Sequence, residues 1–193
     1  MTGRGCLAWA GLAAFLLGAP AVPSPAAATD AVVSQAQVRI AERTLFDTEG
    51  RPVRFGGGAV GGGAVAILSF TYTGCTTICP VADLVMNGVE GLLAARGRDD
   101  LRLLTLTIDP FNDTPDRLAA RVAEVGSGPG RMWLTGEPGA VFSVLDGLGL
   151  RYGRLEAHDT FFLVVDRRGR RVLRVLAEQA DPELLLRLAD GLR

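Results

Sequence analysis

The sequence predicts an α/β fold in which a central, mostly parallel sheet is flanked by helices. A continuous apolar run over 64–72 is typical of a strand that is buried on both faces. Apolar residues then recur at helical spacing over 81–93, and a second apolar strand follows over 101–108. A strand, a helix and a strand in this order predict two parallel strands joined by a crossover helix.

The second half of the chain continues the alternation of helices and strands. Asp113-Thr114-Pro115 predicts a helix start, with Thr114 as N-cap and Pro115 at the first position. The remaining expected elements are a short strand at 131–134, a helix at 141–148, strands at 161–165 and 171–176 joined through Arg168-Gly169, and a helix that begins at Asp181-Pro182. A terminal β-β-α unit after a βαβ unit is the thioredoxin arrangement, so we expect a thioredoxin-like fold.

An N-terminal hairpin should precede this fold. Leu45 to Phe55 contains two short apolar segments around the turn-forming residues 47–50. The next segment, 56–63, has six glycines in eight positions and predicts a flexible loop.

The N-terminus has the pattern of an export signal. Arg4 precedes an apolar segment, Cys6 to Ala19, and Ala26-Ala27-Ala28 offers a cleavage site. We expect a signal peptide at 1–28, a linker at 29–37 and the thioredoxin-like domain at 38–193. An uncleaved membrane anchor at 1–28 is the alternative. Either way, the domain is expected in the periplasm or at the outer face of the cytoplasmic membrane.

Composition excludes two classes of function. The formal net charge is −1, whereas a nucleic-acid partner would call for a basic face. All 20 basic residues are arginine, and a P-loop nucleotide site needs a lysine.

Two cysteines occupy the reactive position of the expected fold. Cys75 and Cys79 follow the first central strand, and Pro80 must lie in the first turn of the next helix. The positive end of the helix dipole favours thiolates, which bind metals and attack disulfides. A plain structural disulfide is the alternative, but so small a loop would constrain the unfolded chain little.

His158 is the one histidine of the chain and comes just before the strand at 161–165. In a thioredoxin-like fold, the loop that enters this strand packs against the cysteine turn. Redox thioredoxins have a cis-proline there, and this chain has none. Two thiolates and an imidazole would form a soft site for Cu(I), with Zn(II) as competitor. A closed structural zinc site would need a fourth ligand. A solvated loop histidine is the alternative.

Three motifs, in order, resemble the Sco/SenC copper chaperones of cytochrome oxidase. They are Tyr72-Thr73-Gly74-Cys75 through Cys79-Pro80, the segment Thr107 to Pro115, and His158-Asp159-Thr160. The resemblance runs from about Val38 to Leu192. It implies that Cys75, Cys79 and His158 bind Cu(I) and Cu(II), and we expect one copper per chain. It also implies delivery to an oxidase subunit, with thiol redox work attached.

Several alternatives stay open at this point. Asp109 matches a family aspartate near the copper site that is linked to redox function or partner docking, but a loop-capping role would also explain it. The same cysteines would serve an exported thiol:disulfide oxidoreductase, for which His158 is not needed. A copper sensor or buffer, or a peroxidase of the peroxiredoxin type, would also use this segment. Another exported copper enzyme could replace the oxidase as recipient.

Overall fold

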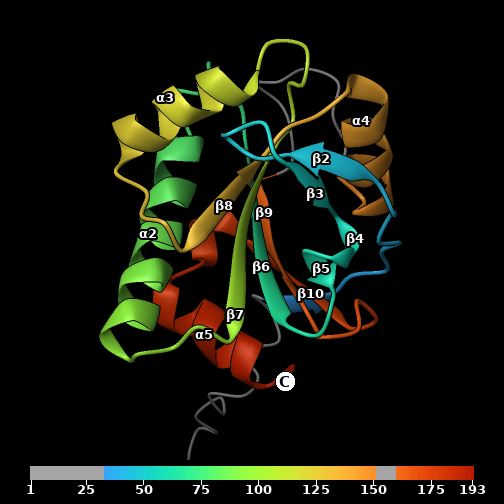
Figure 1. Ribbon diagram of the computed structural model, residues 1–193. Coiled ribbons are helices and arrows are strands. Elements are labelled where there is room, and N and C mark those ends of the chain that lie inside the picture. The colour runs from blue at the N-terminus through green and yellow to red at the C-terminus, as the bar shows by residue number, and fades with distance from the viewer. Residues whose placement is uncertain (1–32, 151–159) are drawn as a thin grey trace, which may run out of the picture.

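A six-stranded sheet forms the centre of the computed structural model, which describes residues 33–150 and 160–193 (Figure 1). The strand order is β1-β10-β9-β6-β7-β8. In chain order the strands are β1 (Val33–Gln35), β6 (Val65–Thr71), β7 (Leu101–Thr107), β8 (Arg131–Leu134), β9 (Phe161–Val165) and β10 (Val172–Leu176). Every residue of β6 is buried, as its apolar run predicted.

The sheet is mixed, so the expectation of a mostly parallel sheet is wrong. β6 and β8 run parallel to β7, because helices carry both crossovers. β9 runs antiparallel to β6, with Ala66 opposite Val165 and Leu68 opposite Leu163. β10 returns from β9 as a hairpin and is antiparallel by necessity, and β1 pairs antiparallel with β10.

Strand β1 lies inside the 29–37 segment that we expected to be a linker. Val33 pairs with Val175 and Gln35 with Leu173, which places β1 at the edge of the sheet. The side chains of Ser34 and Gln35 are exposed. A three-residue edge strand with exposed side chains has no hydrophobic pattern by which its sequence could be recognised.

Helix boundaries follow the local signals. α2 (Cys79–Ala95) has Pro80 in its first turn, and α3 (Pro115–Val125) is capped by the Thr114 hydroxyl, which accepts the N–H of Arg117 at 3.3 Å. The other helices are α4 (Pro138–Gly147), the 3₁₀ helix η2 (Ala177–Gln179) and α5 (Pro182–Asp190), the last capped by Asp181. Within the described residues, no helix combines the length and apolarity needed to cross a bilayer.

Two apolar layers cover the two faces of the sheet. α2 and α5 pack on one face, against side chains that include Ile67, Leu103 and Val164. The other face is covered by α4 and by the expected hairpin, β2 (Thr44–Phe46) and β3 (Pro52–Arg54). Figure 1 shows these layers on opposite sides of the strands. The thioredoxin-like fold is thus confirmed, with the hairpin as its extension.

The glycine-rich segment is packed, so the expectation of a flexible loop is wrong. It forms a short parallel pair, β4 (Gly56–Gly58) with β5 (Val60–Gly61). A Cβ on Gly56 would lie 2.7 Å from the Ala41 carbonyl oxygen, and one on Gly62 only 2.1 Å from that of Gly58. The glycines therefore permit close approach of backbones.

Candidate metal and redox site

Both cysteines lie where β6 turns into α2. β6 ends at Thr71, the chain turns through residues 72–78, and α2 begins at Cys79. The N–H of Cys75 donates to the Tyr72 carbonyl at 3.0 Å, which closes the turn. The site therefore sits at the carboxyl end of the central parallel strands, where α/β folds present their functional loops.

Cys75 and Cys79 are joined by a disulfide, with their Cα atoms 5.9 Å apart. Each residue is only 2% exposed and belongs to the core cluster on the α4 side of the sheet. The backbone N–H of Cys79 donates to the sulfur of Cys75 at 3.3 Å. When the bond is reduced, this N–H lies ready to stabilise negative charge on the Cys75 sulfur.

No side chain at the start of α2 compensates the positive end of the helix dipole. Ile78 is the N-cap and provides no side-chain hydrogen bond, and the first turn contains no acidic residue. The positive end of the helix dipole therefore favours an anion at this point. A thiolate is the anion that the sequence supplies there.

Asp113 ties the cysteine turn to the neighbouring strand. Its carboxylate accepts the hydroxyl of Thr73 at 2.5 Å, the N–H of Thr73 at 3.1 Å and the hydroxyl of Thr107, at the end of β7, at 2.5 Å. Its backbone carbonyl accepts the hydroxyl of Thr135 at 2.6 Å. Asp113 is 1% exposed, so this buried carboxylate fixes the position of the turn two residues before Cys75.

Asp109 organises its own loop. Its side chain accepts the amide of Asn112 at 2.8 Å, and its carbonyl accepts the N–H groups of Asn112 and Asp113. The N–H of Asp109 donates to the Thr107 hydroxyl at 2.9 Å. These contacts are those of a loop-capping aspartate, at the same end of the sheet as the cysteines.

His158 lies outside the described residues. Within residues 33–150 and 160–193, no cluster of three or more histidine, cysteine, aspartate and glutamate side chains could hold a metal ion. The structure therefore brings together two of the three expected ligands, and their sulfurs form the soft part of the donor set.

A buried charged network lies one helical turn after Cys79. Asp83, 4% exposed, pairs with Arg121 at 3.0 Å and with Arg131. Arg131 also donates to the hydroxyl of Thr105 at 2.6 Å. Burial lowers the pKa of Arg131, and the charge and hydrogen bond of Asp83 oppose that shift. The network locks the first half of α2 against α3 and the sheet.

Exposed apolar side chains surround the start of α2. Val81 is 43% exposed, Leu84 is 71% exposed, and Phe111 in the loop after β7 is 73% exposed. The ring of Phe111 packs against that of Phe142 of α4, with ring centroids 5.8 Å apart. A groove of about 320 Å³ beside Pro80 separates α2 from α3 and includes Leu84 in its wall. This apolar surface is suited to contact with another protein.

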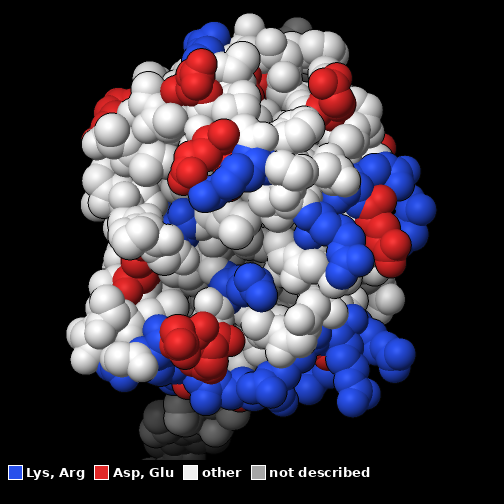
Figure 2. Space-filling model, in the orientation of Figure 1, with Lys and Arg blue, Asp and Glu red and all other residues white. Residues whose placement is uncertain are grey.

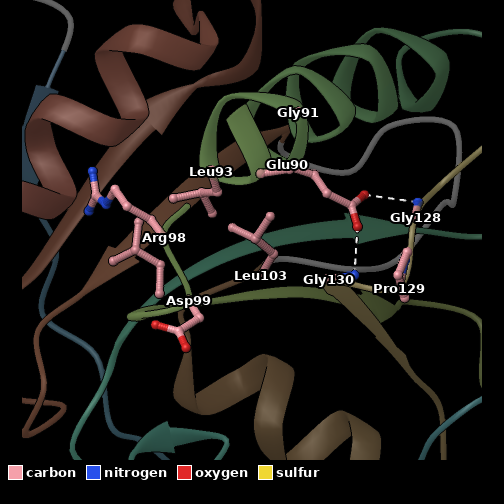
Figure 3. A pocket seen from close by; sticks show the side chains of 11 residues that line it. Glu90, Gly91, Leu93, Arg98, Asp99, Leu103, Gly128, Pro129 and Gly130 are labelled. Carbon is pink, nitrogen blue, oxygen red and sulfur yellow. Dashed lines mark hydrogen bonds between the residues drawn. The ribbon is translucent and has the colours of Figure 1, made fainter. Parts of the chain in front are cut away.

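A separate pocket of about 530 Å³ lies at the other end of α2 (Figure 3). Glu90 in its wall is eleven residues beyond Cys79, about 16 Å along the helix axis. Both oxygens of Glu90 are engaged by the N–H groups of Gly128 and Gly130, at 2.9 and 2.7 Å. Neither Cys75 nor Cys79 lines this pocket, so we assign it no part in the cysteine chemistry.

Sequence reasoning missed the roles of Asp113 and Asp83. Asp113 looked like a helix-start residue, although parallel strands β6 and β7 must end at the same edge, which would have placed it near Thr73. Asp83 stands on a helix face that is otherwise apolar, next to Ala82 and Met86. A lone acidic residue in such a stripe was a usable signal of a buried ion pair.

Comparisons with known proteins agree with this geometry. A family model described as SCO1/SenC matches residues 34–190. A "Putative copper-binding protein" of Stutzerimonas stutzeri is 34% identical over 86 residues, which cover 45% of this chain and 41% of that protein. The match thus spans less than half the length of this curated relative.

Solved structures with the same fold include members of this family. The structure of Bradyrhizobium japonicum ScoI with copper bound has a TM-score of 0.65 at 19% identity, covering 80% of this chain and 99% of that chain. BsSco, described as a member of the Sco family of cytochrome c oxidase assembly proteins with a disulfide switch, has a TM-score of 0.68 at 21% identity, covering 83% of this chain and 98% of that one. Since the family model spans most of the sequence, this chain belongs to the SCO1/SenC family.

Proposed function

We propose that this protein is an exported metallochaperone that carries one Cu(I) or Cu(II) ion on Cys75, Cys79 and His158. Its cargo would go to the copper-site subunit of cytochrome c oxidase or to another exported copper enzyme. The observation that carries the proposal is the pair of sulfurs at the head of α2 in a SCO1/SenC member. The copper-bound ScoI structure and the relative named as copper-binding support the choice of metal.

Loading would require reduction of the disulfide. The Cys75–Cys79 bond occupies both sulfurs, and two electrons with two protons convert it into two thiols. The thiols lose their protons when they bind the metal, and the helix start favours the resulting negative charge. A site with three protein donors leaves copper open to a fourth donor from a recipient, which suits transfer.

The recipient would approach the end of the sheet that carries the cysteines. Leu84 and Phe111 provide exposed apolar contact area around the helix start. Asp109, in the same loop as Phe111, would act as an accessory residue at this interface. Its replacement should then alter copper transfer and leave the copper content of the protein unchanged.

A thiol:disulfide oxidoreductase is the second candidate, and the disulfide itself favours it. In the reduced form, one thiolate would attack a disulfide of the partner and form a mixed disulfide. The second cysteine would then release the partner as a dithiol and restore the Cys75–Cys79 bond. The N–H of Cys79 beside the Cys75 sulfur would stabilise Cys75 as a thiolate.

The variant His158→Ala separates the two functions. Under the chaperone proposal, Cu(II) binding should be lost, because Cu(II) favours a nitrogen donor beside thiolate, whereas Cu(I) should persist on two sulfurs. Reduction of a partner disulfide should be unchanged, and oxidase maturation should fail. Cu(II) absorption, disulfide reduction and oxidase assembly should be measured on the same preparation, with Cys75→Ser as the variant that loses all three.

The oxidoreductase alternative predicts a different outcome for oxidase maturation. His158→Ala would then keep its reductase activity and show only a mild maturation defect. Unchanged Cu(II) binding together with normal oxidase assembly would remove His158 from the ligand set and contradict the chaperone proposal.

A further inference from the structure

The turn between β9 and β10 concentrates positive charge. Its sequence, residues 166–171, is Asp-Arg-Arg-Gly-Arg-Arg, so four arginines and one aspartate give it a net charge of +3. All four arginine side chains are exposed. Figure 2 shows basic side chains gathered along the lower right of the molecule, where Figure 1 draws this turn. We call residues 166–171 the arginine turn.

The fold does not require arginine at these positions. Asp166 sets the turn, because its carboxylate accepts the N–H of Arg170 at 2.7 Å and its own N–H donates to the Arg171 carbonyl at 3.0 Å. Gly169 supplies the left-handed conformation, with φ of 69°. Four like charges on so short a turn repel one another, so the hairpin would be more stable with neutral residues there.

Within the described part of the chain, none of these four arginines has an acidic side chain as an ion-pair partner. Three other arginines at this end of the molecule are paired: Arg96 with Glu183, and both Arg98 and Arg193 with Asp190. The described residues therefore leave the charge of the arginine turn without an acidic counter-charge.

The turn is held rigidly by its neighbours. The carbonyl of Arg167 accepts the N–H of Gly63 at 3.0 Å, and a Cβ on Gly61 would lie 3.4 Å from the carbonyl oxygen of Arg168. A Cβ on Gly169 would lie 3.3 Å from the Ile40 side chain. The glycine-rich segment thus acts as a support on which the turn rests, and the guanidinium groups are presented from a fixed backbone.

The arginine turn lies at the opposite end of the sheet from the cysteines. Val165, just before the turn, pairs with Ala66 near the start of β6, whereas Cys75 follows the end of β6. The loop at the cysteine end has the opposite charge, since residues 109–116 contain three aspartates and no basic residue. An anionic surface would therefore attract the arginine turn and repel the loop at the cysteine end.

We propose that the arginine turn binds the surface of an anionic phospholipid membrane and orients the cysteine end away from it. The charge complements acidic headgroups, and arginines near such a surface attract it strongly. The cavity beside the turn, lined in part by Gln35 and Arg170, is only about 70 Å³, too small for the side chains of a bound peptide. A flat, extended surface therefore fits the arginine turn better than a peptide segment that inserts into a cavity. This inference goes beyond the proposed copper function and does not depend on it.

The test compares full-length protein with two charge-matched variants. Arg168→Gln/Arg170→Gln removes two charges from the turn, and Arg43→Gln/Arg117→Gln removes two exposed charges elsewhere. Each is titrated with vesicles of phosphatidylcholine alone and of phosphatidylcholine containing phosphatidylglycerol. For each protein, the affinity for the anionic vesicles is divided by the affinity for the phosphatidylcholine vesicles. This ratio cancels the hydrophobic contribution of the apolar N-terminal segment, which is the same for both kinds of vesicle. All the proteins should remain folded, because the replaced side chains are exposed. The thermal unfolding midpoint of the turn variant should equal or slightly exceed that of the wild-type protein, because two like charges are removed from the turn.

The wild-type protein should prefer the anionic vesicles, and the preference should weaken as salt is raised. Each arginine should change the affinity for anionic vesicles about fivefold. The affinity ratio of the turn variant should therefore fall about 25-fold, and that of the control variant less than about twofold. Arg168→Lys/Arg170→Lys should retain the preference, because headgroup attraction depends on charge. An equal loss in both glutamine variants, or no loss in the turn variant, would overturn the proposal. A lysine variant as weak as the glutamine variant would overturn it in favour of an acidic protein partner that needs bidentate guanidinium contacts.

Discussion

The carboxylate of Asp113 accepts both the hydroxyl and the backbone N–H of Thr73, forty residues earlier in the chain. Thr73 lies in the turn that leads to Cys75, and the Asp113 carboxylate also accepts the hydroxyl of Thr107 at the end of β7. One buried carboxylate thus links the cysteine turn to the loop that follows the neighbouring strand. The geometry of the two sulfurs depends on this link, although Asp113 contacts neither of them directly in the hydrogen bonds described.

Replacement of Asp113 by asparagine should destabilise the protein and loosen the cysteine turn. Hydrogen bonds to a charged group contribute about 1.5–3 kcal/mol each, and the amide cannot accept from both threonines equally well. We expect a loss of about 2–3 kcal/mol in the free energy of unfolding and weaker Cu(I) binding. Urea denaturation and a competitive copper titration would measure both.

The exposed Asp116, three residues later, provides the control for this change. Asp116→Asn should alter stability by less than about 0.5 kcal/mol and leave copper affinity unchanged. Equal behaviour of the two variants would show that the Asp113–Thr73 link does not support the site.

Removal of the Asp83 charge should be among the most damaging single changes to the fold. Asp83→Asn leaves the buried guanidinium groups of Arg121 and Arg131 without their shared counter-charge. Loss of one partner of a buried ion pair costs about 3–5 kcal/mol. The matched variant is Asp100→Asn, whose carboxylate forms partly exposed pairs with Arg98 and Arg193 and should cost less than about 1 kcal/mol. If denaturation gives similar values for both, the network contributes little.

Asp47 should make the stability of the hairpin region depend on pH. Burial raises the pKa of Asp47, but hydrogen bonds from the Arg51 side chain and from the N–H groups of Arg51 and Glu49 outweigh it, so the pKa lies below 3.8. A carboxyl with a lower pKa in the folded state stabilises the protein above its unfolded pKa. That contribution is lost as the pH falls through the folded value.

Asp47→Asn should therefore lower stability at neutral pH and reduce the further loss of stability below about pH 4. Thermal midpoints measured from neutral to acidic pH would test this. Glu49→Gln is the control, because its carboxylate is 64% exposed and its ion pair is with the exposed Arg51. Parallel pH profiles for Asp47→Asn and the wild-type protein would contradict the assignment.

Local signals in the sequence predicted most of the elements, and non-local contacts account for what was missed. Pro80, Thr114 and Asp181 mark helix starts within a few residues, and the structure has helices there. The direction of β9 depends on its pairing with β6, about a hundred residues earlier, and no local pattern encodes that choice. The glycines at 56–63 suggested a loop because composition alone does not reveal the backbones that approach them.

For the same reason, some residues of the candidate site were predicted from the sequence and others were missed. The cysteine pair could be located because its position depends on one strand and one helix start that are adjacent in the chain. Asp113 was assigned to its local helix, and its contact with Thr73 becomes visible only when β6 and β7 lie side by side. His158 was assigned through its place before β9, and that assignment stays a prediction.

A Cu(I) titration of the reduced full-length protein against a competing chelator tests the copper proposal most directly. It should be made in the Cys6→Ser background, so that Cys75 and Cys79 are the remaining thiols of the three cysteines in the chain. The account predicts saturation at one Cu(I) per chain, and loss of that binding after oxidation to the Cys75–Cys79 disulfide. Equal copper uptake by the reduced and oxidised forms, or no uptake by either, would contradict it.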